Sequence, residues 1–147
     1  MENLFARSVF FVKDTERSLR FYTNTLGFKL DWNHQEQGRA CVFQVSLFGF
    51  QLILNQTEAE ARTENRPGHG RVFIGLEHDQ VGAFRRHFSE RRVKIAVQHW
   101  GRPTLVIRDL DENELFIWVP EGDWASLEAE LAGATKDDDG SFPIRTT

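Results

Sequence analysis

The chain has 147 residues, of which 40% are hydrophobic and 27% charged, a balance typical of a folded globular domain rather than a disordered chain. Its net charge of -4 gives no electrostatic reason to expect nucleic acid as a partner. Apolar runs are short and interrupted by charges, so no segment is expected to cross a membrane, and the N-terminus lacks the apolar run of a secretory signal. The single cysteine, Cys41, excludes an internal disulfide and fits a cytoplasmic location.

The first half of the chain is predicted to fold as a βαβββ unit. A continuously apolar strand over residues 8–12 precedes a helix capped by Asp14 or Thr15, because either side-chain oxygen can accept a free backbone N–H. Gly27 sits where a helix C-terminus needs a left-handed residue. The apolar face of this helix, at helical spacing, consists of Leu19, Tyr22 and Leu26. Three further strands are predicted over residues 28–32, 39–47 and 50–55.

The second half repeats this plan after a polar linker over residues 56–70. A strand over 71–77 leads to a helix capped by Asp79, and the apolar face of that helix consists of Val81, Phe84 and Phe88. Further elements are predicted as strands over 93–98, 104–107 and 115–119 and a short helix over 124–131. The sequence thus predicts one domain over residues 1–132, made of repeats at about 5–55 and 70–120. Residues 133–147 have little apolar surface to bury and are predicted to be a mobile tail.

Two stretches carry a resemblance to a known family. Residues 7–32 read RSVFFVKDTERSLRFYTNTLGFKLDW and residues 108–119 read RDLDENELFIWV. Together they resemble the vicinal oxygen chelate superfamily, which includes glyoxalase I, extradiol dioxygenases and bleomycin-resistance proteins. The resemblance implies an α+β fold in which two βαβββ modules pair their curved sheets into a cup, with helices on the convex face and the ligand on the concave face.

Enzymes of the resembled family hold one metal ion with four side chains, two from each repeat. At the matching places this chain carries Arg7, Gln51, Arg71 and Phe116. Arginine stays protonated and phenylalanine has no donor atom, so neither can ligate a divalent cation. The five histidines fall mostly on predicted turns, linkers or a helix and offer no replacement set: His34, His69, His78, His87 and His99. The sequence therefore predicts no metal and no other cofactor, and argues against the family's usual enzyme chemistry.

Strand alternation predicts which side chains face a ligand, because successive residues point to opposite faces of a sheet. The residues expected to face it are Arg7, Val9, Phe11, Gln51, Ile53, Arg71, Phe73, Glu114, Phe116 and Trp118. The two arginines occupy equivalent positions in the repeats, and two readings of them remain open. Either they bind an anionic or carbonyl-rich ligand through forked hydrogen bonds, or Glu114 neutralises one while the other reaches solvent.

Aromatic residues suggest a stacking surface for a flat ligand, formed by Phe116 and Trp118. Trp32 and Trp100 are interpreted as rim or dimer-contact residues, since tryptophan is enriched at interfaces. The acidic stretch from Asp109 to Glu114 is interpreted as a turn whose carboxylates bond local backbone. Cys41, on an apolar strand, is interpreted as a small core residue.

These observations favour a homodimeric, metal-free small-molecule binding protein similar to the bleomycin-resistance branch, which sequesters planar drugs in aromatic clefts. Such a protein would confer antibiotic resistance by binding, and its ligand here would be small, planar and, if the arginines bind it, anionic. Two alternatives remain. A glyoxalase- or dioxygenase-like metalloenzyme requires a different strand register, and a non-catalytic accessory protein requires an apolar dimer surface without a formed pocket.

Overall fold

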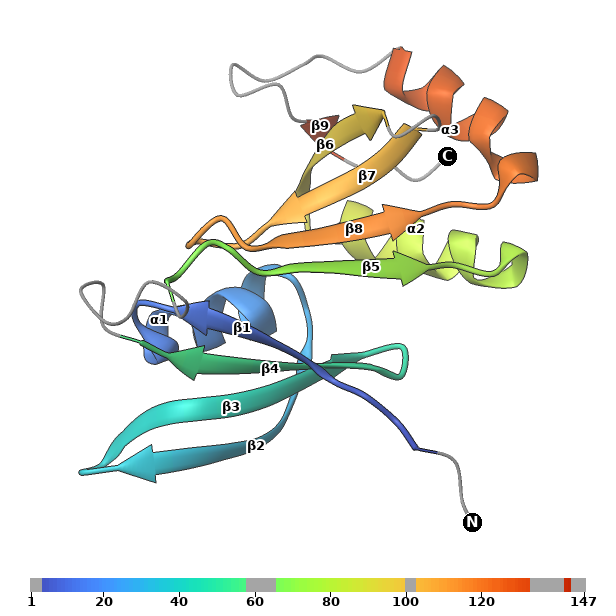
Figure 1. Cartoon of the computed structure of the whole chain (residues 1–147). Coiled ribbons are helices and arrows are strands. Elements are labelled where there is room, and N and C mark those ends of the chain that lie inside the picture. Colours follow the sequence, from blue (N-terminus) through green and yellow to red (C-terminus); the bar gives the residue numbers. More distant parts are fainter. Residues whose placement is uncertain (1–3, 58–65, 100–102, 133–141, 144–147) are drawn as a thin grey trace. The chain divides into compact units, whose positions relative to one another are not determined.

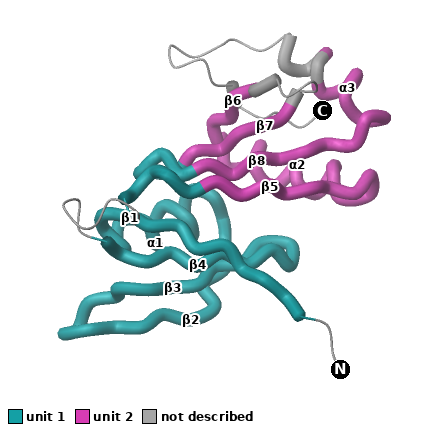
Figure 2. Tube along the Cα trace, in the orientation of Figure 1, with its two compact units in different colours: residues 1–70, 109–113 teal, residues 71–108, 114–147 magenta. Residues whose placement is uncertain are grey.

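The computed structural model describes residues 4–57, 66–99, 103–132 and 142–143 (Figure 1). The chain forms two compact units (Figure 2). Unit 1 contains residues 1–70 and 109–113, and unit 2 contains residues 71–108 and 114–147. Each unit begins with the order strand, helix, three strands, and unit 2 adds one more helix and a two-residue strand. The predicted α+β fold of two βαβββ modules is therefore confirmed.

Unit 1 is built on a four-stranded sheet with the order β1-β4-β3-β2. Its strands are β1 (Ser8–Val12), β2 (Lys29–Glu36), β3 (Arg39–Leu47) and β4 (Phe50–Gln56). The edge strand β1 runs parallel to β4, and the other neighbours are antiparallel. Strand β2 extends four residues beyond its predicted end, so Trp32 lies inside the strand rather than at its terminus.

A helical segment covers one face of this sheet. Helix α1 (Thr15–Arg20) begins at Asp14, whose side chain accepts the backbone N–H of Arg17, and it continues as a π-helical turn, η1 (Phe21–Thr25). Gly27 ends the segment with a φ of 73°, as predicted. The sheet face under the helix is fully apolar and buried: Phe10, Val12, Phe43, Val45, Leu52 and Leu54, with Tyr22 and Leu26 from the helical segment.

Two β-bulges interrupt the pairing of β2 with β3. The register passes from Leu30 opposite Val45 to Trp32 opposite Gln44, which leaves Asp31 as an extra residue on β2. It then passes from His34 opposite Val42 to Gln35 opposite Ala40, which leaves Cys41 as an extra residue on β3. A bulge re-aims the side chain of the extra residue, so both side chains depart from simple alternation.

The loop between β7 and β8, residues 109–113, belongs to unit 1 although the chain enters and leaves it from unit 2. Asn113 is fully buried; its side-chain amide donates to the carbonyl of Phe11 at 3.0 Å, and its Oδ1 accepts the N–H of Gly70 at 2.8 Å. The Asp109 carboxylate accepts the N–H groups of Asp111 and Asn113, both at 2.9 Å. The predicted turn with carboxylate-to-backbone bonds is therefore present.

Unit 2 is built on a second sheet, with the order β5-β8-β7-β6-β9. Its strands are β5 (Arg71–Gly75), β6 (Lys94–His99), β7 (Pro103–Arg108), β8 (Glu114–Trp118) and β9 (Phe142–Pro143). Strand β9 pairs with β6 within the segment predicted to be a mobile tail; the other residues of 133–147 lie outside the described part of the chain. Strand β5 is parallel to β8 and keeps one exposed face, whereas the β8 residues Leu115, Phe116 and Ile117 are all buried.

Helix α2 (Val81–Glu90) buries the predicted face of Val81, Phe84 and Phe88. The predicted cap at Asp79 is wrong, because a short 3-10 turn, η3 (His78–Gln80), precedes α2 and is capped by Glu77. The side chain of Gln80 accepts the N–H of Glu77 at 2.8 Å, which completes a reciprocal capping box. Helix α3 (Glu121–Ala132) buries Trp124 and Leu127. Among the described helices, none has the length and apolar character needed to cross a membrane.

Candidate functional site

In unit 1, the two residues that the resemblance placed at the family's metal positions bond to each other. The Nε of Arg7 donates to the Oε1 of Gln51 at 2.9 Å, and the guanidinium of Arg7 also lies 4.7 Å from the ring centre of Phe5. Gln51 is the one member of the predicted set with an oxygen able to ligate a metal ion, and that oxygen is held by a cation. The pair therefore does not fit a divalent cation.

The face of the unit 1 sheet that carries this pair is turned away from the helix. Val9 is 44% exposed, and Phe11 and Ile53 are half-buried, whereas Phe10 and Val12 are buried. Register places Val9 beside Ile53 on neighbouring strands. The faces of β1 and β4 thus follow the alternation that was expected. We call the side of the sheet turned away from the helix the open face of unit 1. It presents Arg7, Val9, Phe11, Gln51 and Ile53.

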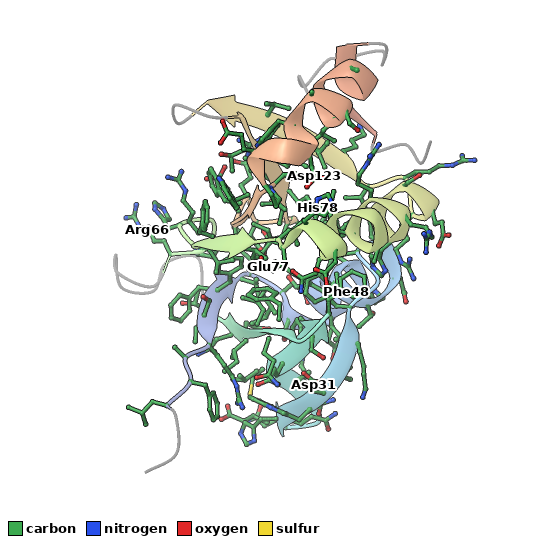
Figure 3. All side chains as sticks on the ribbon, turned by 90° about the vertical axis from the view of Figure 1, so that its right-hand side faces the viewer. Asp31, Phe48, Arg66, Glu77, His78 and Asp123 are labelled. Atoms are coloured by element: carbon green, nitrogen blue, oxygen red, sulfur yellow. The ribbon has the colours of Figure 1, made fainter. Side chains whose placement is uncertain are left out.

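A polar cluster on the same face was missed by the sequence reasoning. The carboxylate of Asp31 (Figure 3) accepts the Nε2 of Gln44 at 2.8 Å and the hydroxyl of Ser46 at 2.9 Å. The hydrogen bond from Gln44 is the main cause that lowers the pKa of Asp31, with smaller contributions from Ser46, Lys29 and Arg7. Gln44 is buried, and its Oε1 has no hydrogen-bond partner in the structure.

The alternation of polar and apolar residues along β3 could have predicted two members of this cluster. Gln44 and Ser46 alternate with the apolar Phe43 and Val45 along β3, which places two polar side chains on the face opposite the helix. The position of Asp31 could not be read in this way, because a bulge at that residue shifts the register. Register also joins the cluster to the arginine pair, since Ser46 lies opposite Gln51.

In unit 2, Arg71 makes two contacts with its own sheet. Its Nη2 and Nε donate to the Oε1 of Glu114 at 2.8 and 3.2 Å, and its guanidinium lies over the ring of Phe116 at 4.7 Å from the centroid. Arg108 approaches the second oxygen of Glu114 at 3.1 Å. Glu114 thus meets two guanidinium groups.

The aromatic residues considered for a stacking surface differ in their solvent exposure. Phe116 is only 2% exposed because Arg71 lies over its ring, and Trp118 is half-buried. Phe73, directly opposite Phe116 in the register, is 54% exposed. In unit 1, Trp32 is 41% exposed, and Trp100 lies outside the described residues. The exposed aromatic surface on β5 is therefore that of Phe73, beside the paired Arg71.

The histidines lie partly on different elements from those expected. His34 is on β2 and His99 at the end of β6, whereas both were expected outside strands; His78 is in η3, His87 in α2, and His69 in a loop. None occupies the positions where the family holds its metal ion. In each unit, the residues at those positions are instead engaged as Arg7–Gln51 and Arg71–Phe116.

Solved structures similar to this chain include antibiotic-binding proteins. TnmS3, an antibiotic binding protein from Streptomyces sp. CB03234, is 23% identical, with a TM-score of 0.53 over 82% of this chain and 100% of that chain. The bleomycin-binding protein of Streptomyces verticillus, solved with copper(II)-bleomycin, is 16% identical, with a TM-score of 0.57 over 82% and 99%. TioX from Micromonospora sp. ML1 is 15% identical, with a TM-score of 0.55 over 78% and 97%.

At these identities the likeness concerns the fold. No curated protein matches the chain. Residues 5–116 match the family described as the Glyoxalase/Bleomycin resistance protein/Dioxygenase superfamily. This match spans most of the chain, and the two βαβββ units and similar solved structures agree with it. The chain therefore belongs to the Glyoxalase/Bleomycin resistance protein/Dioxygenase superfamily.

Proposed function

We propose that the protein binds a small, flat molecule on its open sheet faces and acts by sequestering it, without a metal ion at the family's usual positions. The observation that carries this proposal is the surface of β5, where Phe73 is 54% exposed beside the guanidinium of Arg71. An exposed aromatic ring next to a cation offers a stacking surface and an anchor for negative charge.

The charges of unit 2 support an acidic or carbonyl-bearing ligand. Glu114 is shared between Arg71 and Arg108, so two guanidinium groups are gathered at this part of the sheet. Arg71 is already held in place by Glu114 and Phe116. A side chain fixed in this way loses little further conformational entropy when it binds a ligand.

The similar proteins support the same class of function, because TnmS3 is an antibiotic binding protein and the Streptomyces verticillus protein binds bleomycin and was solved with copper(II)-bleomycin. For this chain, the proposal extends to a homodimer in the cytoplasm and to a role in antibiotic resistance. Trp32, 41% exposed on edge strand β2, is the described residue that we assign to the rim or dimer contact.

A pair of matched probes tests the binding proposal: 1-anilinonaphthalene-8-sulfonate, which is flat and anionic, and the uncharged N-phenyl-1-naphthylamine. Titration calorimetry on the folded protein should show saturable binding of both. Phe73→Ser should weaken both, because it removes stacking area. Arg71→Met should weaken only the sulfonate, by about tenfold, the cost of one hydrogen bond to a charged group.

Phe48→Ser is the matched control, because Phe48 is 58% exposed but lies in the β3–β4 turn rather than on the open face. It should leave both affinities unchanged. The proposal would be contradicted if neither probe bound saturably, or if Phe73→Ser and Phe48→Ser weakened binding equally. If Arg71→Met left the affinity for the sulfonate unchanged, Arg71 would not be part of the binding site.

A further inference from the structure

Three side chains with different metal-ligating groups meet on the β2–β3 hairpin of unit 1. Ligand atoms of His34, Glu36 and Cys41 all lie within 4.8 Å of one another. The Nε2 of His34 is 3.6 Å from the Oε1 of Glu36. None of the three is at the positions that the resemblance assigns to the family's metal ion, and none is among the residues on which the binding proposal above rests.

The backbone explains why the three groups converge. His34 and Glu36 are two residues apart on β2, so they share the open face of the sheet. In an unbroken ladder Cys41 would lie opposite Gln35 and face the helix, like Phe43 and Val45. The bulge at Cys41 breaks that alternation, and the thiol instead lies 3.4 Å from the carbonyl oxygen of His34.

The hairpin turn fixes this arrangement. Gln37 and Gly38 form the two-residue connection, and both have positive φ, 52° and 75°. Two consecutive residues of positive φ are the mark of a type I′ turn, whose twist matches that of the flanking strands. The turn pairs Glu36 with Arg39 and thereby sets the register at this end of the hairpin, up to the bulge at Cys41. The backbone of the hairpin therefore brings the three residues together.

The spacing suits a small divalent cation. Zinc lies about 2.0–2.2 Å from imidazole nitrogen and carboxylate oxygen, so two such ligands at a tetrahedral angle are about 3.4 Å apart. The observed 3.6 Å between the Nε2 of His34 and the Oε1 of Glu36 is close to that separation, and the sulfur of Cys41 lies within 4.8 Å of both ligand atoms. Thiolate together with imidazole selects zinc-type metals over magnesium or calcium.

Access and charge agree with such a site. The side chains of His34 and Glu36 are 63% and 73% exposed, and β2 is the edge strand of its sheet, so an ion can enter without unfolding. Three protein ligands leave the fourth tetrahedral corner for water. Arg39 lies opposite Glu36 in the register.

We propose that His34, Glu36 and Cys41 form a binding site for a zinc-type divalent metal ion on the β2–β3 hairpin. Cys41 binds as thiolate and releases its proton to solvent when the sulfur–metal bond forms. The ion joins the end of β2 to β3 across the bulge. This inference is independent of the proposed small-molecule binding, because it uses none of the residues of that proposal.

Cobalt(II) titration of the tag-free full-length protein under reducing conditions tests this site. Cobalt occupies zinc sites, and a thiolate ligand gives it a charge-transfer absorption in the near ultraviolet. Saturation at one ion per chain with this absorption is expected, and zinc should displace the cobalt. Cys41→Ser should abolish the absorption. His34→Ala, which keeps the sulfur, should weaken binding by about tenfold or more, since even outer-shell changes at metal sites cost that much.

His69→Ala is the matched control, because His69 is an exposed histidine of the same unit outside the hairpin; it should bind cobalt like the unmodified protein. The melting temperature of each variant, measured without metal, shows whether it is folded. If Cys41→Ser does not fold, the comparison of His34→Ala with the unmodified protein tests the proposal instead. Arg71→Met should leave the titration unchanged. The proposal is overturned if the charge-transfer absorption is absent, or if His34→Ala and His69→Ala bind cobalt equally.

Discussion

At the residue scale, the most consequential contact of unit 1 joins Tyr22 to Asp109. Tyr22 is fully buried, and its hydroxyl donates to the Oδ2 of Asp109 at 2.9 Å. Burial raises the pKa of Asp109 above its ordinary value, and hydrogen bonds from Asn113 and Tyr22 oppose that shift. Burial also raises the pKa of Tyr22 well above its ordinary value, with the Asp109 charge adding to it. The phenol therefore stays a donor throughout the physiological range.

Tyr22→Phe is expected to destabilise the protein by about 1.5–3 kcal/mol, the typical contribution of a hydrogen bond to a charged group. The loss should be measured by urea unfolding at neutral pH. Because the variant removes a bond that lowers the pKa of Asp109, its folded-state pKa rises further. The penalty should therefore shrink as pH falls through that pKa and Asp109 becomes protonated.

Asp109→Asn supplies the control for Tyr22→Phe. In the Asp109→Asn background, the same tyrosine substitution should cost clearly less, because the charge that strengthened the bond is gone. Tyr22→Phe keeps the ring contacts with Phe21 and Phe28, so its cost reports on the hydroxyl alone. Equal costs in both backgrounds would show that this contribution does not depend on the charge of Asp109.

At the element scale, an ion pair links the start of helix α2 to helix α3 within unit 2. The Nδ1 of His78, in η3, lies 2.8 Å from the Oδ2 of Asp123 (Figure 3). The hydrogen bond to the Asp123 carboxylate is the main cause that raises the pKa of His78, and the Asp123 charge adds to it. The pair therefore joins two helical elements that follow different strands of the sheet.

This pair predicts a pH-dependent stability with a defined sign. A histidine whose folded-state pKa is raised stabilises the fold fully below its unfolded value of about 6.5. That contribution disappears as pH rises through the folded-state pKa. The melting temperature should therefore fall as pH increases upward from about 6.5, and Asp123→Asn should remove this dependence. An NMR titration of the His78 ring that shows no upward pKa shift relative to Asp123→Asn would contradict it.

At the scale of the whole molecule, unit 1 is discontinuous in sequence. Residues 1–70 are completed by the loop 109–113, which supplies Asp109 to Tyr22 and Asn113 to Phe11 and Gly70. Gly70 must be glycine here, because a Cβ would lie 2.4 Å from the Phe10 ring and 2.8 Å from the Asn113 Oδ1. The two halves of the chain are therefore not independent modules joined by a simple linker.

A fragment of residues 1–70 is accordingly predicted not to fold with the stability of unit 1 in the full chain. It lacks every partner from the 109–113 loop, and a buried polar group left unsatisfied costs about 1–3 kcal/mol. Circular dichroism during urea unfolding should show a broad or absent transition for the fragment. A cooperative transition at the midpoint of the full-length protein would refute the dependence on this loop.

The sequence predicted those parts of the molecule that depend on local periodicity. Alternation along β1 separated buried Phe10 from exposed Val9, and helical spacing identified the buried face of Val81, Phe84 and Phe88. These patterns are local because the side-chain direction repeats every two residues in a strand and about every 3.6 in a helix. The resemblance supplied the family and the residues at its metal positions, and the chemistry of arginine and phenylalanine already argued against a metal ion there.

Only the tertiary structure decided which charged and polar groups meet. Tyr22 and Asp109 are 87 residues apart in the chain, and the stacking of Arg71 on Phe116 depends on the register of β5 with β8. The bulges that re-aim Asp31 and Cys41 follow from pairing between two strands and leave no mark on either strand alone. Local sequence therefore determines the faces of this protein, whereas non-local pairing determines the contacts made on them.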